Sequence, residues 1–393
     1  DDWWQLLSSP AKDDVLAEVK AQLEEDEKSY KKTGRVSLLA KWMCSSNASS
    51  STTRYYAHII NTSLGMTERN YRKMLTKYRK ALDLVEVKMS ANEWNKINYS
   101  AVPSRANLIY KDAFMRHDRE RRVEYLESLK KGEAKINAGV LQPHEIVRKY
   151  NLASTDETLE SLWKALSDEV IDNTLVVRDG SASMLDPYQT GVGVRPLDVA
   201  TALSIYMAEH NRESWKGKFI TFSKTPKFVD ISNANSLREK LLICNRETEC
   251  SNTNIEATMM LVLETAIDNN ISQAEMPKRI VIVSDMQFDR CVGVNESHLL
   301  KGPTKADFER IADKFKEHGY LMPKIVFWNV SGKVNNTIPM QENELGVILY
   351  SGFSTQLLHM VMSGKTDPYE ALLETINVPR YAPIDLALNN VGI

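Results

Sequence analysis

The segment Asn173–Met184 reads NTLVVRDGSASM and joins a short apolar run to a polar loop. The apolar run Leu175–Val177 has the length and composition of a buried β-strand. Asp179, Ser181 and Ser183 then place oxygen-bearing side chains at every second position. On an extended segment that turns into a loop, such side chains can converge on one point. Hard oxygen donors suit Mg²⁺, Ca²⁺ or Mn²⁺, so the segment predicts a divalent-cation site that other loops must complete.

Downstream of residue 170, short apolar runs alternate with amphipathic segments. Strands are expected at Leu175–Val177, Phe219–Phe222, Ile280–Val283, Ile325–Trp328 and Val347–Tyr350. Helices are expected at Leu197–His210, Ile255–Asn269, Phe308–His318 and Thr355–Met362. Uninterrupted apolar strands separated by helices indicate a parallel sheet that is covered on both faces. We therefore predict a doubly wound, mostly parallel α/β domain over residues 166–393, with Phe228–Asp230 added as an antiparallel partner of the second strand.

Two later segments supply further oxygens to the predicted cation site. In a doubly wound sheet, ligands gather at the carboxyl ends of the strands, where the strand order reverses. Asp285 follows the strand Ile280–Val283, and Thr253 precedes the helix that starts near Ile255. Ser251, in the same loop as Thr253, stays open as an alternative ligand. Asp289, four residues after Asp285, is a further candidate for the metal shell.

The order Asp-x-Ser-x-Ser, then Thr, then Asp, on this pattern of strands and helices, resembles the metal-ion-dependent adhesion site of von Willebrand factor A domains. The resemblance covers roughly residues 170–393. It implies a divalent cation, Mg²⁺ first and Ca²⁺ or Mn²⁺ as alternatives, held by Asp179, Ser181, Ser183, Thr253 and Asp285. It also implies a site that binds and does not catalyse, with one coordination position left for an acidic group of a partner. Many members of the wider superfamily have Asp-Gly where this chain has Asp285 and Met286. This difference leaves open whether Asp289 takes over part of the metal-binding role.

Each of these residues also has an ordinary structural interpretation. Ser183 could cap a helix behind a polar turn, Thr253 could be a helix N-cap, and Asp285 could simply end a strand. Enzyme motifs are missing: there is no GxSxG elbow, no GxxxxGK[ST] phosphate loop, and no histidine in a motif with a nucleophile. The joint occurrence of the oxygens favours the metal site, and we expect a protein that is not an enzyme.

Composition indicates the compartment. The chain has four cysteines without a CxxC pair, which predicts a reducing, cytoplasmic location and argues against a structural zinc site. No run of about 18 apolar residues exists, so no membrane partner is expected. The chain opens with DDWW, which is neither a signal peptide nor an initiator methionine, so we expect a piece of a longer protein.

Residues 1–165 are expected to form a helical domain, with TROVE-like or HEAT-like repeats as the candidate arrangement. Val15, Val19 and Leu23 have helical spacing on a charged background, and Thr67 is a candidate N-cap. Further helices are expected at Asp13–Tyr30, Ala106–Arg116 and Asp118–Lys131.

The helical part is basic in its middle. Residues 61–150 carry 19 Lys and Arg against 11 Asp and Glu, which suggests a polyanionic partner. The candidate RNA-binding residues are Arg69, Arg72, Lys73, Lys77, Arg79, Arg116, Arg119 and Arg122. Tyr71, Tyr78 and Tyr110 could stack bases beside them. The alternative is a solvated charged surface, with Tyr71 and Tyr78 packed in the core.

A type A domain behind a helical domain is similar to the Ro ribonucleoprotein family, in which the helical TROVE module binds RNA. A poorly characterised family of bacteria, phages, plants and large DNA viruses looks closer. The segments that carry this second resemblance are Leu38–Trp42, Met89–Trp94, Val102–Ala106, Gly132–Gly139 and Pro143–Val147. The first functional hypothesis is a Ro-like, RNA-binding ribonucleoprotein component with a divalent cation. The alternative is a metal-dependent protein-interaction or assembly module, such as an ATPase adaptor or a virion structural protein, whose partner is an acidic protein ligand.

Overall fold

A computed structural model describes residues 3–166, 173–188, 190–191, 193–247, 254–285, 305–331, 347–352, 373 and 376–378. The chain forms two compact units. The first comprises Asp1–Val102 with Tyr110–Tyr125, and the second Pro103–Ile109 with Leu126–Ile393. The boundary expected between residues 165 and 166 therefore lies inside the second unit. The reason is burial, because helices on both sides of that boundary share one apolar core.

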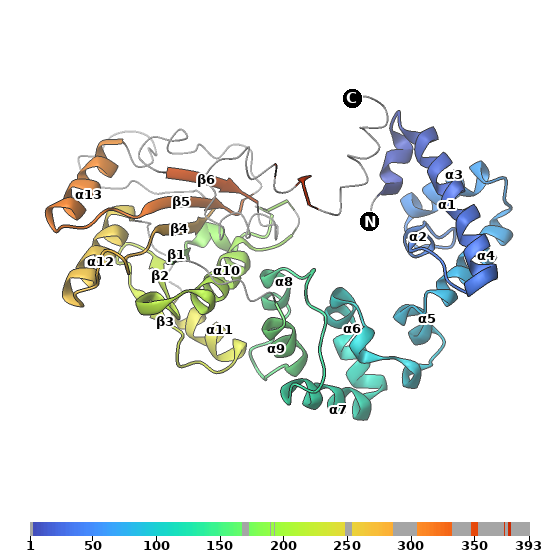
Figure 1. The fold of residues 1–393 in the computed structure, drawn as a ribbon, viewed down its shortest axis with the longest axis horizontal. Coiled ribbons are helices and arrows are strands. Elements are labelled where there is room, and N and C mark those ends of the chain that lie inside the picture. Colours follow the sequence, from blue (N-terminus) through green and yellow to red (C-terminus); the bar gives the residue numbers. More distant parts are fainter. Residues whose placement is uncertain are drawn as a thin grey trace. The chain divides into compact units, whose positions relative to one another are not determined.

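The first unit is helical, as expected (Figure 1). Its elements are η1 Trp3–Ser8, α1 Lys12–Thr33, α2 Leu39–Trp42, α3 Ser51–Ser63, α4 Glu68–Ala81, α5 Val85–Ser90, η2 Trp94–Lys96 and η3 Tyr99–Ala101. The predicted N-cap is confirmed, since the Thr67 hydroxyl accepts a hydrogen bond from the Asn70 N–H at 3.3 Å. Helix α4 buries Tyr71, Leu75 and Tyr78 at helical spacing, so the tyrosines belong to the core.

Two helices contribute residues to both units. They are α6 Ser104–His117 and α7 Arg119–Lys130, close to the expected Ala106–Arg116 and Asp118–Lys131. Gly132 follows α7 with φ 75°, a left-handed conformation that glycine adopts at little cost and that ends many helices.

The second unit holds the α/β domain. Its described elements are α8 Pro143–Val147, α9 Glu157–Lys164, β1 Thr174–Asp179, η4 Ala182–Leu185, α10 Pro196–His210, η5 Glu213–Trp215, β2 Lys218–Phe222, β3 Phe228–Asp230, α11 Leu237–Arg246, α12 Ile255–Asp268, β4 Arg279–Ser284, α13 Lys305–Glu317, β5 Lys324–Asn329 and β6 Val347–Ser351. Every expected strand is present. The expected helix Thr355–Met362 lies outside the described residues. Helix α11 was not predicted, although Leu237, Leu241 and Cys244 have helical spacing behind the N-cap Ser236.

The six strands form one sheet in the order β3-β2-β1-β4-β5-β6. All neighbours are parallel except β2 and β3, which form the predicted antiparallel hairpin. The chain proceeds from β1 to β2 on one side and returns to β4 on the other, so β1 and β4 lie at the point where the strand order reverses. This order confirms the predicted doubly wound, von Willebrand factor A-like α/β class.

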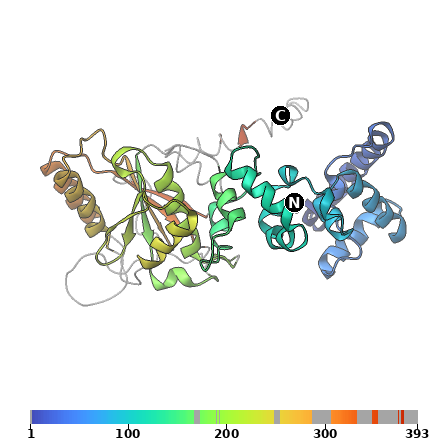
Figure 2. The same cartoon turned by 90° about the horizontal axis from the view of Figure 1, so that it is seen from below.

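Helices cover both faces of the sheet (Figures 1 and 2). Val176 faces a core shared with α8, α9, α10 and α11. Leu175 and Val177 face the opposite core, shared with α12 and α13. Successive strand residues point to opposite faces, so a strand that is covered twice must be apolar at every position. That requirement explains the uninterrupted apolar runs of the sequence.

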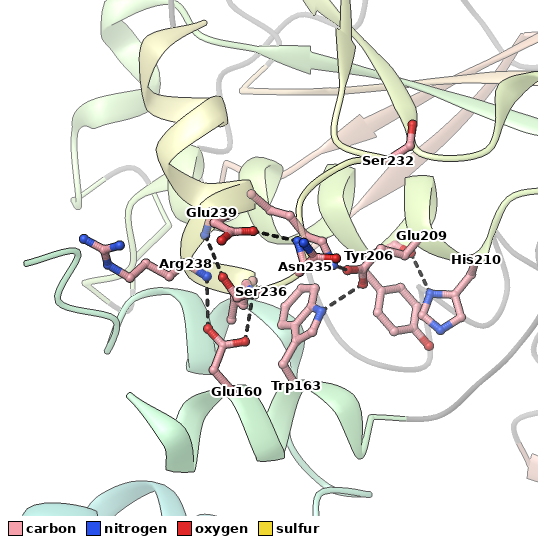
Figure 3. A network of polar contacts seen from close by, with 12 residues as sticks. Glu160, Trp163, Tyr206, Glu209, His210, Ser232, Asn235, Ser236, Arg238 and Glu239 are labelled. Atoms are coloured by element: carbon pink, nitrogen blue, oxygen red, sulfur yellow. Dashed lines mark hydrogen bonds and ion pairs between the residues drawn. The ribbon is translucent and has the colours of Figure 1, made fainter. Parts of the chain in front are cut away.

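Helix α8 shares the apolar core of the α/β domain through Ile146 and Val147, and side chains of α9 also bind α10 and α11. The Glu160 carboxylate accepts hydrogen bonds from the backbone N–H groups of Leu237 at 2.8 Å and Arg238 at 3.1 Å. Figure 3 shows Glu160 pointing from α9 toward the start of α11, beside the bond from the Trp163 indole to Glu209. A carboxylate at the first turn of a helix satisfies free N–H groups and complements the helix dipole.

Replacing Glu160 with Gln is expected to lower the free energy of unfolding by about 1–3 kcal/mol, because Gln has a single acceptor oxygen and leaves a buried N–H without its partner. Urea denaturation followed by circular dichroism measures the change. Glu157→Gln is the matched control, since Glu157 on the same helix forms a solvent-exposed ion pair with Lys130. Equal losses in the two variants would contradict the capping role of Glu160.

Within the described ranges, every helix is too short or too polar to cross a bilayer.

Candidate metal centre

The two predicted carboxylates lie at the same edge of the sheet. Asp179 is the last residue of β1, and Asp285 directly follows β4. The strands are parallel neighbours with Arg178 opposite Val283, so their carboxyl ends meet. The Ser284 hydroxyl donates a hydrogen bond to Asp179 Oδ2 at 2.5 Å, which joins the two strand ends directly. The register of the sheet therefore brings together residues 106 positions apart in the sequence.

The predicted serines fold back onto Asp179. The Ser181 N–H donates to Asp179 Oδ1 at 2.8 Å, which closes a tight turn. Ser181 Oγ and Ser183 Oγ lie 3.1 Å apart, within hydrogen-bond distance. Ser183 lies inside η4 and is not its N-cap residue, so the interpretation of Ser183 as a helix cap is wrong. The described structure thus holds Asp179, Ser181 and Ser183 in one loop, and their binding of a metal stays a prediction.

Burial makes this group of carboxylates electrostatically costly. Asp179 and Asp285 both have 0% of their surface exposed. The pKa of Asp179 is raised to about 6, mainly by burial and to a smaller extent by the nearby Asp285, although the hydrogen bonds from Ser284 and Ser181 act to lower it. Two ionised carboxylates in a buried region need a compensating positive charge. The site is therefore suited to a cation.

The donor set fits a hard divalent ion. It offers two carboxylates and two hydroxyls, all oxygen ligands of the kind that Mg²⁺, Ca²⁺ and Mn²⁺ accept. In the part of the chain that the structure describes, no group of three or more His, Cys, Asp or Glu side chains could hold a metal by itself. A site built at this edge from the described residues would therefore use hydroxyl oxygens beside its two carboxylates.

Three of the predicted ligands, Thr253, Ser251 and Asp289, lie outside the described residues. The described start of α12 tests the interpretation of Thr253 as a helix N-cap. Asn254 is the N-cap of α12, and its side chain accepts the N–H of Ala257 at 2.9 Å. The alternative interpretation of Thr253 as this N-cap is therefore wrong.

Arg178 is a residue that the sequence reasoning missed. It is 1% exposed, and its guanidinium donates to the carbonyl oxygens of Cys244 at 3.0 Å and Glu247 at 3.4 Å. It therefore binds the carboxyl end of α11, immediately before the segment that contains Ser251 and Thr253. The sequence signal for Arg178 is a charged residue inside an apolar strand, between Val177 and Asp179.

The basic residues proposed to bind RNA divide into two groups. Arg122 is fully buried, with its guanidinium 5.0–5.3 Å from the ring centres of Tyr99, Phe114 and Tyr125. Lys77 pairs with Glu27 at 2.7 Å, and Arg79 donates to the carbonyl oxygens of Ala40 in α2 and of Met43 just after it. These three cations stabilise the helical unit. Those that stay exposed are Arg69, Arg72, Lys73, Arg116 and Arg119.

The tyrosines are not a base-stacking platform. Tyr71 is 0% exposed and donates to the Cys44 carbonyl at 2.8 Å, and Tyr78 is 2% exposed and donates to Glu27 at 2.6 Å. The core-packing alternative is confirmed for both residues. Tyr110 is half-buried. RNA binding by this helix stays a prediction, without aromatic support from Tyr71 or Tyr78.

Two family models match this chain over different ranges. A family model described as Domain of unknown function (DUF2828) matches residues 37–176. An uncharacterized protein of Acanthamoeba polyphaga mimivirus is 32% identical over 379 residues, which cover 91% of this chain and 63% of the viral protein. The chain thus spans less than two thirds of that relative, which comes from a large DNA virus as the sequence resemblance led us to expect. Membership of the Ro family stays a prediction, since the matching models carry other descriptions.

Among solved structures, the SpRpn10 VWA domain is similar at 15% identity and a TM-score of 0.27, over 50% of this chain and 96% of that one. Proximal thread matrix protein 1 from the mussel byssus, with a zinc-occupied MIDAS motif, is 13% identical at a TM-score of 0.28, over 49% and 46% of the two chains. Manganese-loaded TRAP protein of Plasmodium vivax is 12% identical at a TM-score of 0.27, over 47% and 69%. A further family model matches residues 173–378, which include the sheet and both carboxylates. By this match over more than half of its length, the chain belongs to the family described as Domain of unknown function (DUF7788).

Proposed function

We propose that the α/β domain binds a divalent cation between Asp179 and Asp285 and uses it to capture an acidic group of a protein partner. The observation that carries this proposal is the burial of both carboxylates at the same sheet edge, next to the hydroxyls of Ser181 and Ser183. Thr253 is the proposed third hydroxyl ligand, with Ser251 and Asp289 as alternatives. Mg²⁺ is the proposed ion.

The cation would supply a positive charge with a coordination position for an outside oxygen. The chain's own residues hold the site in shape. Asp179 is fixed by hydrogen bonds from Ser181 and Ser284, so its oxygens are oriented before any ion binds. The Ser181 and Ser183 hydroxyls are hydrogen-bonded to one another, an arrangement that suits metal ligation and does not activate either oxygen as a nucleophile. These features support a binding site and not an enzyme.

Exposed apolar side chains beside the loop favour a protein partner. Leu185 ends η4 and is 42% exposed, and Tyr188 follows with 85% exposed. Exposed aromatic residues are typical of protein–protein interfaces, where they are enriched and contribute much of the binding energy. A partner that presents a carboxylate to the cation can therefore cover these side chains in the same contact.

Metal binding is tested by titrating the full chain with MnCl₂ and MgCl₂ in a calorimeter. We expect Ser183→Ala to weaken the affinity about tenfold or more, because one oxygen ligand is lost. Ser214→Ala is the matched control, since Ser214 is exposed in η5, which precedes β2 and so lies at the opposite edge of the parallel strands from the carboxyl end of β1. Equal affinities in both variants would contradict the assignment of Ser183.

The open coordination position is tested with bound Mn²⁺. Water-proton relaxation reports water on the ion, and an aspartate-containing peptide is expected to lower it by displacing that water. The same peptide with asparagine should have little effect, because a neutral amide is a poorer ligand for a hard cation. If Mn²⁺ bound but both peptides behaved alike, the metal site would stand and capture of acidic groups would be ruled out.

A further inference from the structure

The first unit contains a pocket whose charged lining residues are all cationic. The pocket has a volume of about 440 Å³ and is lined from α4 by Arg69, Arg72, Lys73 and Arg79. No acidic residue and no aromatic ring is among the described residues that line it. Like charges repel at close range. A fold that gathers four of them in one hollow is therefore suited to an anion.

Helical periodicity creates this arrangement. Arg69, Arg72 and Lys73 are spaced by three and four residues, which places them on one face of α4. Tyr71 and Tyr78 point to the core from a different face. The basic face is thus a separate surface of the helix. It lies against the segment that follows α2.

Arg79 forms the fixed part of the pocket. Its guanidinium donates to the carbonyl oxygens of Ala40 at 2.8 Å and Met43 at 2.7 Å, and to the Ser45 hydroxyl at 2.8 Å. All three partners are neutral, so the positive charge of Arg79 is held in position without being cancelled. Burial lowers the pKa of Arg79, which is the cost of holding this charge away from water. A bound anion would offset that cost.

The remaining cations are available to a ligand. Among the described residues, Arg69 and Lys73 form no ion pair. Arg72 approaches Glu68 only to 3.9 Å, and both side chains are at least half exposed, so this contact is weak. Lys77 on the same helix differs, because it is paired with Glu27 at 2.7 Å and does not line the pocket.

We infer that this pocket binds a compact phosphate group with two or more negative charges, of the oligophosphate class. Arginine donors suit the oxygens of such a group, and the neutral side chains of Ser45, Asn47 and Thr76 add hydrogen-bonding groups around it. None of the described lining residues is aromatic, so a nucleobase would have no ring to stack on. The pocket is therefore matched to the phosphate itself and not to a nucleobase.

The test uses the full chain and sodium triphosphate as the probe, in buffer with EDTA and no divalent ion. Chelation keeps the probe from binding through a cation at Asp179, so this result is independent of the proposed metal site. Calorimetry is expected to detect binding that weakens as NaCl is raised. Arg72→Gln with Lys73→Gln, both exposed, should reduce the affinity at least about thirtyfold, since each removes a charge-assisted contact.

Lys80→Gln is the matched control, because Lys80 is an exposed cation of α4 that does not line the pocket. We expect the affinity of this variant for triphosphate to stay within about twofold of that of the unchanged chain, because the charge that is removed is distant and screened. Circular dichroism checks that the variants keep their helix content. Absence of triphosphate binding, or equal binding by the double variant, would overturn the inference. Single-stranded RNA of 12 nucleotides is tested in the same way. If this RNA bound more tightly than triphosphate, and the double variant lost affinity for it to the same extent, the pocket would belong to a nucleic-acid surface. That result would overturn the oligophosphate assignment.

Discussion

Asp179→Asn is expected to make the metal-free protein more stable above pH 6 and to remove its stabilisation by Mg²⁺. In the metal-free state Asp179 and Asp285 are both buried, so the ionised Asp179 is held in an unfavourable place. Asparagine has nearly the same shape without the charge. Its oxygen can still accept from Ser181, and its amide can donate to the Ser284 hydroxyl after that hydroxyl rotates. The variant therefore avoids the free-energy cost of burying a charge and keeps the turn that the Ser181 N–H closes.

The sign of this effect depends on pH. The pKa of Asp179 rises from 3.8 to about 6 on folding, mainly through burial. Below pH 4 the carboxyl is protonated in both states and contributes no difference. Between pH 4 and 6 the unfolded chain loses its proton first, so the folded state loses stability as pH rises. Above pH 6 the full cost is present, about 3 kcal/mol at most for a change of this size.

Chemical denaturation at pH 4 and pH 8, with EDTA or with saturating Mg²⁺, measures both effects. At pH 8 in EDTA the variant should exceed the unchanged chain in free energy of unfolding. In Mg²⁺ the variant's advantage should shrink by about 2.7 kcal/mol, since an ion at 100 times its dissociation constant stabilises the unchanged chain by that amount. Asp313→Asn is the control, because Asp313 is exposed on α13. A variant that matched this control under all four conditions would remove the basis of the metal site.

Arg122→Ala is expected to lower the free energy of unfolding by about 3 kcal/mol. The side chain fills a fully buried space in the first unit, against the rings of Tyr99, Phe114 and Tyr125. Truncation leaves a cavity and removes the attraction of the guanidinium to the ring faces. The loss comes from packing as well as from charge.

Urea denaturation compares this variant with Arg119→Ala. Arg119 is exposed at the start of α7, so its replacement should change stability by less than about 0.5 kcal/mol. From the sequence, Arg119 and Arg122 are equal candidates for contacts with RNA. Similar, small effects for the two residues would mean that Arg122 has no packing role and would restore it as a candidate surface contact.

The elements of the α/β domain could be predicted because burial leaves a periodic signal. A strand covered on both faces must be apolar throughout, as in Leu175–Val177, and the residue that ends it can be polar, as at Asp179. The two carboxylates could be paired in advance because parallel strands end at a common edge. Helix α11 was missed although its N-cap Ser236 and its apolar spacing were legible.

The basic residues could not be sorted in advance. Arg69, Arg79 and Arg122 look equivalent in the sequence, yet Arg69 is exposed, Arg79 is bound to carbonyl oxygens in and just after α2, and Arg122 is enclosed by three aromatic rings. Their environments depend on segments far away in the chain. Tyr99, which covers Arg122, lies 23 residues before it. No local pattern encodes such a contact.

By itself, the sequence determined the α/β fold class, the loop of alternating oxygens and the placement of Asp179 and Asp285 at a common sheet edge, because the periods of strands and helices are local properties. The tertiary structure alone decided that α8 and α9 join the α/β core, that Arg178 holds the end of α11, and that four cations of α4 share one pocket. These features arise from contacts between distant segments. Such contacts exist only after the chain has packed, since a side chain's neighbours there are chosen by shape and charge and not by position in the sequence.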